Sequence, residues 1–373
     1  MKIPKHLAPT VIIAIIFFFI PFFWLKPGEM DLGGDSSRLY FYDPLHYLFS
    51  QSLFSVSRSS FGGESLSFFG IPFFLFLVFF KSIFHSPTTL ISAFHGFSLS
   101  LAFISCYLIV KEFLKGQNEK EKNWIVIEAA SVFAGFSYTL SPVPIHWWGY
   151  PLLTFNQVFI SPLMFFLLLR FFLTKNMRYM IAAILVSVLF APNFSYIGAP
   201  TFFAFYPLAI VFLLIYIKFI RHLSIPVNKL AIGVLLFVLV HSFHLIPQAE
   251  NIFTPGSSTN QAVFTNEVKT GRLGYFSAIA PAIKVSYHLL GLQQLTKPEF
   301  FSFIFIIFPF IFTLGFLWNK RIEYLLTGIF FLITLFFVSA NITHIGFSLY
   351  TLAFHLPGFS MFRNFYGQWQ WAY

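Results

Sequence analysis

Residues 8–47 read APTVIIAIIFFFIPFFWLKPGEMDLGGDSSRLYFYDPLHY, an apolar run that changes abruptly into a polar stretch rich in acids. The apolar part, 8–25, is long enough to cross a bilayer as a helix. It follows Lys2 and Lys5 as a signal peptide would, but it lacks a small-residue cleavage site and ends in the aromatic anchor Phe22-Phe23-Trp24. We therefore expect an uncleaved first membrane span.

The composition of the whole chain predicts a polytopic helical membrane protein. The 373 residues are 57% hydrophobic and 10% charged, against about 25% charged in ordinary soluble domains. Phe alone occurs 58 times. Apolar segments fall at about 8–25, 66–84, 89–110, 124–141, 152–173, 179–192, 200–217, 230–247, 301–318 and 322–340.

The positions of the basic residues predict the orientation. Basic loops occur at 111–123, 174–178, 218–229 and 319–323, and the positive-inside rule places them in the cytoplasm with the N-terminus. This alternation works only if 66–84 does not cross the membrane. Gly70, Pro72 and Lys81 interrupt that segment and favour an interfacial helix.

We therefore predict an all-α transmembrane bundle of about nine spans, plus a juxtamembrane helix at 66–84, in the cell membrane. The net charge of +10 then orients the chain beside anionic lipid, and nucleic acid is not an expected partner. The single Cys106 excludes a disulfide framework within the chain.

No fixed-period repeat or linker divides the sequence, so 1–373 is expected to form one transmembrane domain. On its extracytoplasmic face we expect a first loop at 26–65 with an acidic motif, and a polar, lid-like loop at 248–300. The sequence stops at Tyr373, just after a predicted outer loop. We expect the natural protein to continue beyond it.

The first outer loop is where carboxylates gather. The pair of glycines between Asp31 and Asp35 indicates a turn, with Asp35 capping a helix that begins at Ser36, and Pro44 predicts a break after Asp43. Such carboxylates can act as a general base or bind a divalent ion such as Mg²⁺ or Mn²⁺, for which Asp31 and Asp35 are the candidates. The alternative is a solvated loop whose acids only cap helices. Four of the chain's 13 acids lie here: Glu29, Asp31, Asp35 and Asp43.

Other outer loops supply candidate substrate-binding residues. Trp147 and Tyr150 could stack on a sugar ring, His146 could donate to a phosphate or hydroxyl, and Arg363 could bind a phosphate through two hydrogen bonds. The alternatives are an aromatic interface belt and a snorkelling arginine. The full set is Arg38, His146, Trp147, Tyr150, Asn193, Tyr196, His355 and Arg363.

Three titratable residues inside apolar segments are expected to be structural. His241 and His244 lie near the end of the segment 230–247 and are expected to act as buried polar contacts between helices. Glu128 lies near the start of the segment 124–141, at its cytoplasmic end, and is expected at the membrane interface. The chain holds no P-loop, GxGxxG, HExxH, GxSxG or Cys/His zinc motif, which weakens nucleotide-driven transport and soluble hydrolase chemistry.

Short motifs resemble the GT-C class of membrane glycosyltransferases, and most closely its YfhO-like family, which is related in layout to membrane arabinofuranosyltransferases. The first span is followed by an outer GGD-type motif, here Gly33-Gly34-Asp35. A juxtamembrane apolar segment, here 66–84, then precedes the second span. The other similar elements are Ser137-Tyr138-Thr139-Leu140-Ser141, the turn from Asn193-Phe194 to Gly198, and the element from Leu356-Pro357 to Arg363-Asn364.

This resemblance implies a GT-C-like fold and sugar transfer from a polyprenyl-phosphate-linked donor to a glycan or lipid acceptor on the extracytoplasmic face. It makes Asp35 the leading catalytic base. Asp31 and Asp43, which lie in the same acidic stretch, are expected to support it. The C-terminal spans of longer relatives are missing here. Two other functions stay open: a lipid-linked saccharide transporter, which would need mid-span charges and inverted repeats, and a non-catalytic assembly subunit.

Overall fold

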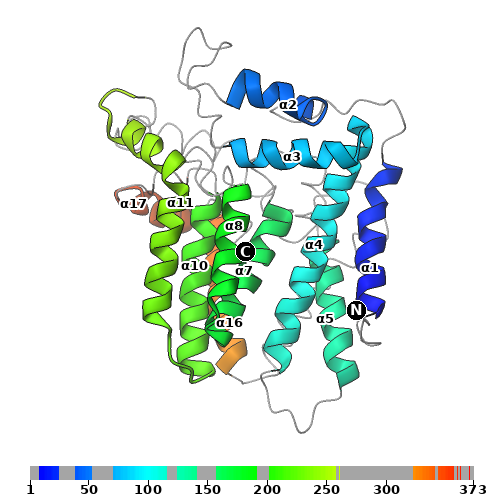
Figure 1. The fold of residues 1–373 in the computed structure, drawn as a ribbon. Coiled ribbons are helices and arrows are strands. Elements are labelled where there is room, and N and C mark those ends of the chain that lie inside the picture. The colour runs from blue at the N-terminus through cyan, green and yellow to red at the C-terminus, as the bar shows by residue number, and fades with distance from the viewer. Residues whose placement is uncertain are drawn as a thin grey trace. The chain divides into compact units, whose positions relative to one another are not determined.

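The computed structural model describes residues 8–24, 38–52, 70–115, 124–140, 157–190, 201–257, 260, 322–340, 343–356, 359, 362 and 369. Every regular element in these ranges is helical, so the predicted all-helical class holds for them (Figure 1). In chain order the elements are α1 (Ala8–Phe19), η2 (Ile20–Phe23), η3 (Arg38–Phe41), α2 (Pro44–Tyr47), η4 (Leu48–Ser52), α3 (Ile71–Ile83), α4 (Pro87–Lys115), α5 (Trp124–Thr139), α7 (Gln157–Thr174), α8 (Met177–Leu189), α10 (Thr201–Ile215), η7 (Tyr216–Ile220), α11 (Val227–Phe253), α16 (Ile322–Ser339) and α17 (His344–Ala353).

Each apolar segment within the described ranges forms a helix close to its predicted bounds, and 301–318 lies outside them. Two of these helices, Pro87–Lys115 and Val227–Phe253, are long and apolar enough to cross a membrane. Shorter apolar helices include Pro9–Phe23, Trp124–Thr139 and Ile322–Phe337. These helices are the features of the described chain that point to membrane association.

Two predicted basic loops are shorter than expected. The helix α4 continues through Lys115, so the first part of the predicted loop 111–123 is helical. Between α7 and α8 only Lys175 and Asn176 remain outside a helix. Lys175 adopts a left-handed backbone with φ of 54°, and the Asn176 side chain accepts a hydrogen bond from the Arg178 amide at 3.0 Å. This helix cap starts α8 at once.

Two predicted outer loops also contain more helix than expected. The helix α11 extends to Phe253, so the loop predicted at 248–300 does not begin until after that residue. The region 341–373, which follows the last predicted apolar segment, contains α17, whose first turn is capped by the Thr343 side chain accepting from the Gly346 amide at 3.0 Å. Local capping therefore sets the start of α17.

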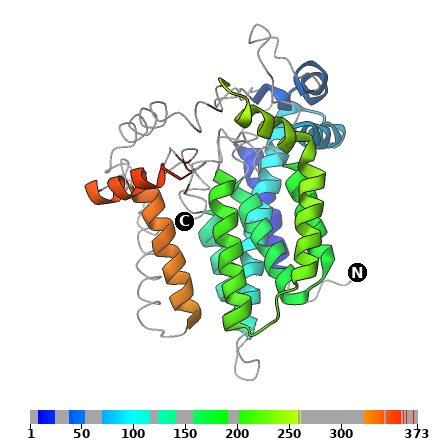
Figure 2. The same cartoon turned by 90° about the vertical axis from the view of Figure 1, so that its left-hand side faces the viewer.

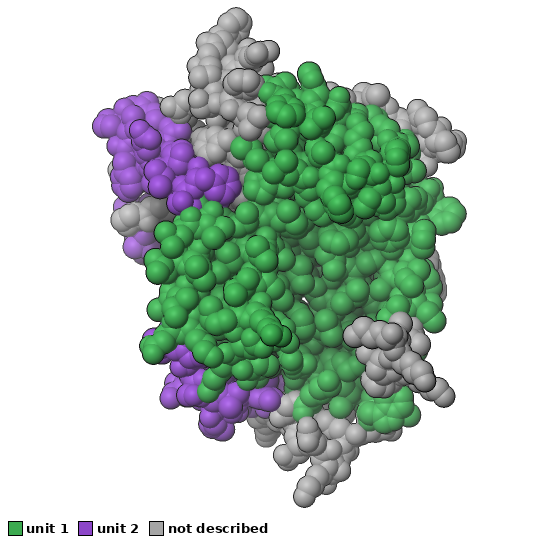
Figure 3. Space-filling model, viewed as in Figure 1, with its two compact units in different colours: residues 1–140, 144–193, 228–241 green, residues 141–143, 194–227, 242–373 purple. Residues whose placement is uncertain are grey.

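The chain divides into two compact units (Figure 3). Unit 1 comprises residues 1–140, 144–193 and 228–241, and unit 2 comprises 141–143, 194–227 and 242–373.

In unit 1, α1, α4, α5, α7 and α8 run alongside one another, while α3 lies crosswise at the N-terminal end of α4, with α2 beyond it (Figures 1 and 2). The helices approach closely at two glycines. A Cβ at Gly96 would lie 2.0 Å from the Phe18 carbonyl oxygen, and one at Gly135 would lie 2.7 Å from the Phe103 ring. Small residues at helix crossings allow the backbones to approach this closely.

In unit 2, α16 packs against α10 and η7, with the Phe212 and Phe330 rings edge to face at 5.3 Å. The helix α17 runs crosswise to α16 (Figure 2). It covers an aromatic cluster in which Tyr350 is fully buried and Phe354 nearly so. Trp369 stacks on Phe337 at 4.2 Å and donates its indole N–H to the Tyr350 hydroxyl at 2.8 Å.

Candidate functional site

The described part of the acidic stretch ends in a short helix whose start is fixed by Asp43. One Asp43 carboxylate oxygen accepts a hydrogen bond from the His46 amide at 3.0 Å. Pro44 occupies the first helical position, where its fixed φ favours a helix and its missing N–H is not needed. The break predicted after Asp43 is therefore the beginning of α2, and the capping role left open for these acids is observed at this residue.

Lys81 on α3 ties α2 to the crossing helix. Its ammonium donates to the Tyr42 carbonyl oxygen at 2.5 Å and lies 4.0 Å from an Asp43 carboxylate oxygen. The side chains of Lys81 and Asp43 are 32% and 62% exposed. We call Tyr42, Asp43, His46 and Lys81 the α2–α3 corner. In the sequence Lys81 stands out only as an interruption of an apolar segment, because its partners come together only in the folded chain.

An aromatic layer holds the α2–α3 corner in place. Tyr40 and Phe41 of η3 are buried, as are Phe73 and Phe74 of α3. The Tyr40 ring lies edge-on to both α3 rings, at 6.2 and 5.8 Å, and Tyr47 of α2 lies 5.1 Å from Phe74. Burial among these rings raises the pKa of Tyr47, and the Tyr47 ring serves here as a packing group.

The α2–α3 corner offers an exposed carboxylate beside an ammonium. Such a carboxylate can take a proton from a hydroxyl, and an ammonium can bind a phosphate as a point charge. Among the described residues, no three His, Cys, Asp or Glu side chains come together as a metal-binding group.

The predicted site residues are only partly described. Asp43 lies at the α2–α3 corner, and Arg38 begins η3 a few residues earlier, with its backbone alone described. His355 lies in unit 2, exposed on the turn after α17, with its Nδ1 atom 3.1 Å from the Leu352 carbonyl oxygen. The predicted residues outside the described ranges are Asp31, Asp35, His146, Trp147, Tyr150, Asn193, Tyr196 and Arg363.

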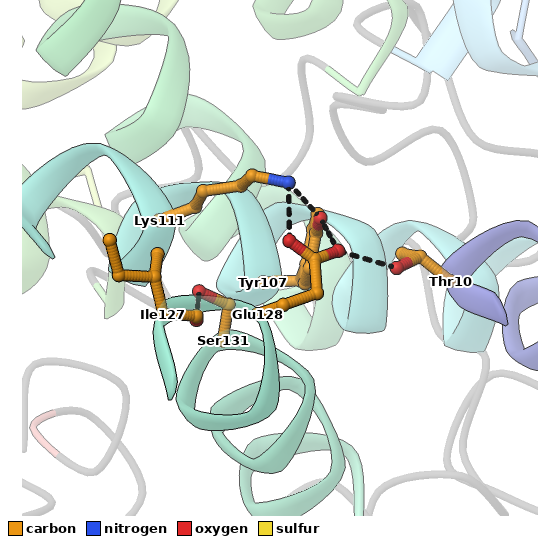
Figure 4. Close-up of polar contacts among 6 residues, drawn as sticks. All are labelled: Thr10, Tyr107, Lys111, Ile127, Glu128 and Ser131. Carbon is orange, nitrogen blue, oxygen red and sulfur yellow. Dashed lines mark hydrogen bonds and ion pairs between the residues drawn. The ribbon is translucent and has the colours of Figure 1, made fainter. Parts of the chain in front are cut away.

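A second polar group, which sequence analysis missed, lies toward the C-terminal end of α4 (Figure 4). Lys111 is 2.7 Å from a Glu128 carboxylate oxygen and also donates to the Tyr107 hydroxyl. That hydroxyl donates in turn to Glu128, which also accepts from Thr10 at 3.4 Å. We call these four residues the Glu128 network. It joins α1, α4 and α5.

The Glu128 network gives Glu128 hydrogen-bonding partners, and its predicted place at the membrane interface stays a prediction. The Lys111 and Glu128 side chains are only 12% and 16% exposed. A charge in such a position is retained when it is paired and hydrogen-bonded. The available signal was an acid within an apolar segment, but nothing in the sequence identified its partners.

Three further polar contacts link helices of unit 1. Arg170 of α7 donates to Glu112 of α4 at 2.8 Å and to the Tyr179 hydroxyl of α8 at 3.1 Å. His241 of α11 is fully buried and lies 2.7 Å from the Ser187 hydroxyl of α8. The predicted structural role of His241 as a polar contact between helices is confirmed.

Comparison with known proteins gives no assignment. No protein-family model, curated protein or solved structure matches the chain.

Proposed function

We propose that this chain is a polytopic membrane glycosyltransferase of GT-C layout. It transfers a sugar from a polyprenyl-phosphate-linked donor to an acceptor hydroxyl on the extracytoplasmic face. The observation that carries the proposal is the crosswise course of α3, which follows the acid-rich stretch and precedes a helix long enough to span a membrane. Asp43, the acid of this stretch that lies in the described ranges, is held beside that crosswise helix by Lys81.

The course of α3 supports the topology on which the proposal rests. A helix that crosses the end of α4 does not reverse the direction of the chain through the bilayer. The basic segments near Lys115 and Lys175 then face the cytoplasm with the N-terminus, as the positive-inside rule requires. The α2–α3 corner then lies on the extracytoplasmic side. Counted in this way, the chain has about nine spans and one juxtamembrane helix.

A lipid-linked donor suits an acidic site at a membrane surface. The isoprenoid chain stays in the bilayer while the phosphate and sugar lie at the interface. In the transfer step the acceptor hydroxyl gives its proton to a carboxylate, and its oxygen forms a bond to the anomeric carbon. The bond from that carbon to the phosphate oxygen breaks, and polyprenyl phosphate leaves with the electron pair. A cation stabilises the charge on the leaving phosphate.

We assign Asp35 as the base and Arg363 as the cation of this step. Asp43 supports the site by starting α2, and Lys81 positions α2 by holding the Tyr42 carbonyl. Asp31 and Asp35 are the residues that would bind a Mg²⁺ or Mn²⁺ ion, and a bound ion would add positive charge near the donor phosphate.

The proposal is tested with membranes that contain the protein and a panel of radiolabelled polyprenyl-phosphate hexoses and pentoses. Cell-envelope material supplies the acceptors. Wild type is expected to move label from one lipid donor into an acceptor, and sugar nucleotides are expected to give no transfer in membranes stripped of polyprenyl phosphate. Asp35→Asn and Arg363→Ala are expected to insert normally and lose transfer. Full activity in both variants would overturn the site assignment.

Two further results would favour the other functions. A transporter would carry the labelled lipid across the wall of a proteoliposome without breaking its sugar–phosphate bond. An assembly subunit would leave every donor in the panel unchanged. Orientation is checked separately with single cysteines at Leu75 and Gln117. A membrane-impermeant maleimide added outside is expected to label position 75 and not position 117.

A further inference from the structure

The helix α17 in unit 2 presents three different faces along its length. Its buried face packs on the aromatic cluster through Tyr350 and Phe354. The buried Gly346 fits close to the Ala340 carbonyl oxygen, which a Cβ at this position would approach to 2.6 Å. These contacts fix how the helix is rotated about its axis, and so determine which side chains point away from unit 2.

A second face is apolar and exposed. Ile345, Leu349 and Leu352 follow the i, i+4, i+7 spacing of one helical stripe, and their exposed fractions are 74%, 53% and 65%. Leu356, just beyond the helix, is 60% exposed. Three large aliphatic side chains in one row, followed by a fourth just past the helix, exceed the scattered exposure that is normal on a soluble surface.

A third face is polar and lies beside the apolar stripe. His344, Ser348 and Thr351 repeat at the same spacing, so they form a parallel row along the helix. The two hydroxyls of this row donate to backbone carbonyl oxygens within α17: Ser348 to His344 at 2.9 Å and Thr351 to Phe347 at 2.8 Å. An apolar row beside a polar row is the pattern of a helix that lies in the plane of a membrane surface.

The preceding helix indicates which surface meets the apolar stripe. Leu325, Ile329 and Leu332 of α16 also follow the i, i+4, i+7 spacing and are exposed. Only a short connection separates α16 from α17, and α17 then turns crosswise (Figure 2). If the exposed row of α16 faces acyl chains, the row on α17 continues that lipid-facing surface at the level where the chain leaves the bilayer.

We infer that α17 is an interfacial helix whose row Ile345, Leu349 and Leu352 inserts into one leaflet of the bilayer. The row of His344 and Ser348 faces the headgroups and water. The inference rests on the membrane setting of the proposed function but not on glycosyl transfer. It concerns a surface in unit 2 that the proposed chemistry does not use, and it makes the lipid leaflet the partner of that surface.

The test measures how deeply nitroxide labels lie in nanodiscs made of phosphatidylcholine and phosphatidylglycerol. Single cysteines are placed at Leu349 and at its neighbour Ser348, in a Cys106→Ser background. Each label is relaxed in turn by oxygen, which concentrates in the bilayer, and by a water-soluble nickel chelate. For each label we take the ratio of its accessibility to oxygen over its accessibility to the nickel chelate. This ratio is expected to be at least about tenfold higher for the label at Leu349 than for the label at Ser348.

A third label at Leu235, an exposed position of α11, separates the possible failures. If the label at Leu235 is more accessible to oxygen and the label at Leu349 is more accessible to the nickel chelate, the apolar row of α17 faces water and the inference is wrong. If Leu235 also favours nickel, the membrane setting itself is wrong, and the proposed function fails with it. Spin–spin broadening confined to Leu349 would show that a second copy of the chain covers the row, which also overturns the inference.

Discussion

The two ends of α4 carry polar groups of opposite character. Near its N-terminal end, Asp43 and Lys81 are separated by 4.0 Å and remain substantially exposed. Toward its C-terminal end, Lys111 and Glu128 are in contact at 2.7 Å and largely buried. The helix rise of about 1.5 Å per residue separates the beginning of α4 from Lys111 by about 36 Å. Exposed charge that is held loosely can meet a substrate, whereas buried charge that is fully paired can only hold helices together.

The largest effect is expected at the buried end. Glu128→Ala removes the partner of Lys111 and leaves an ammonium uncompensated between helices. The free energy of unfolding should fall by about 3 kcal/mol, since breaking a buried pair leaves an unpaired charge. Titration of the detergent-solubilised protein with a denaturing detergent, followed by tryptophan fluorescence, measures this change. A loss of less than about 1 kcal/mol would show that the Glu128 network is not buried as described.

The matched control replaces both partners of the ion pair together. Lys111→Met with Glu128→Leu replaces the two charged side chains with apolar side chains of similar bulk. Neither partner is then left as an unpaired charge. Stability should return to within about 1 kcal/mol of wild type, because apolar pairs often substitute for buried ion pairs without loss. If the double variant is as unstable as Glu128→Ala, the loss comes from packing around Glu128 and not from an unpaired charge.

A smaller effect is expected at Asp43. Asp43→Ala removes the cap of α2 and should lower the free energy of unfolding by about 1 kcal/mol, whereas Asp43→Ser keeps a capping oxygen and most of that stability. The serine variant also removes the carboxylate, so it separates the cap from any part in transfer. Transfer that survives in Asp43→Ser but falls in Asp43→Ala would limit Asp43 to capping and remove it from the predicted catalytic acids.

The smallest effect is expected at Lys81. Lys81→Met should lower the free energy of unfolding by about 0.5 kcal/mol, because a partly exposed pair at 4.0 Å is weak. The same denaturation measurement applies, with Lys111→Met as the comparison at the buried end. Equal losses in the two lysine variants would contradict the contrast between the ends of α4.

Sequence predicted the described helices well because hydropathy sets where they lie. The segment 66–84 contains α3, and Pro44 correctly marked the break after Asp43. Helix ends were less predictable, because capping at Asn176 and the extension of α4 to Lys115 depend on local hydrogen bonds and not on apolarity.

The candidate site was less predictable than the helices. Thr10, Tyr107 and Glu128 meet across sequence separations of up to 118 residues, and no local pattern encodes such a meeting. The helix α17 was missed because apolar and polar residues are mixed along its ten residues. The mean hydropathy of a window over this segment is therefore too low to mark a helix. Asp43 was proposed as a supporting acid from its place in the acid-rich stretch, and capping was the alternative role considered for it.

The central claim is that transfer depends on the acids of the stretch from Glu29 to Asp43 and not on the buried charges toward the C-terminal end of α4. The most direct measurement is the initial rate of sugar transfer from the radiolabelled lipid donor, compared between Asp35→Asn and the double variant Lys111→Met with Glu128→Leu. Rates are taken per amount of folded protein in the same membranes. The account predicts no detectable transfer for Asp35→Asn and a rate within about twofold of wild type for the double variant. Transfer at the wild-type rate by Asp35→Asn would contradict it.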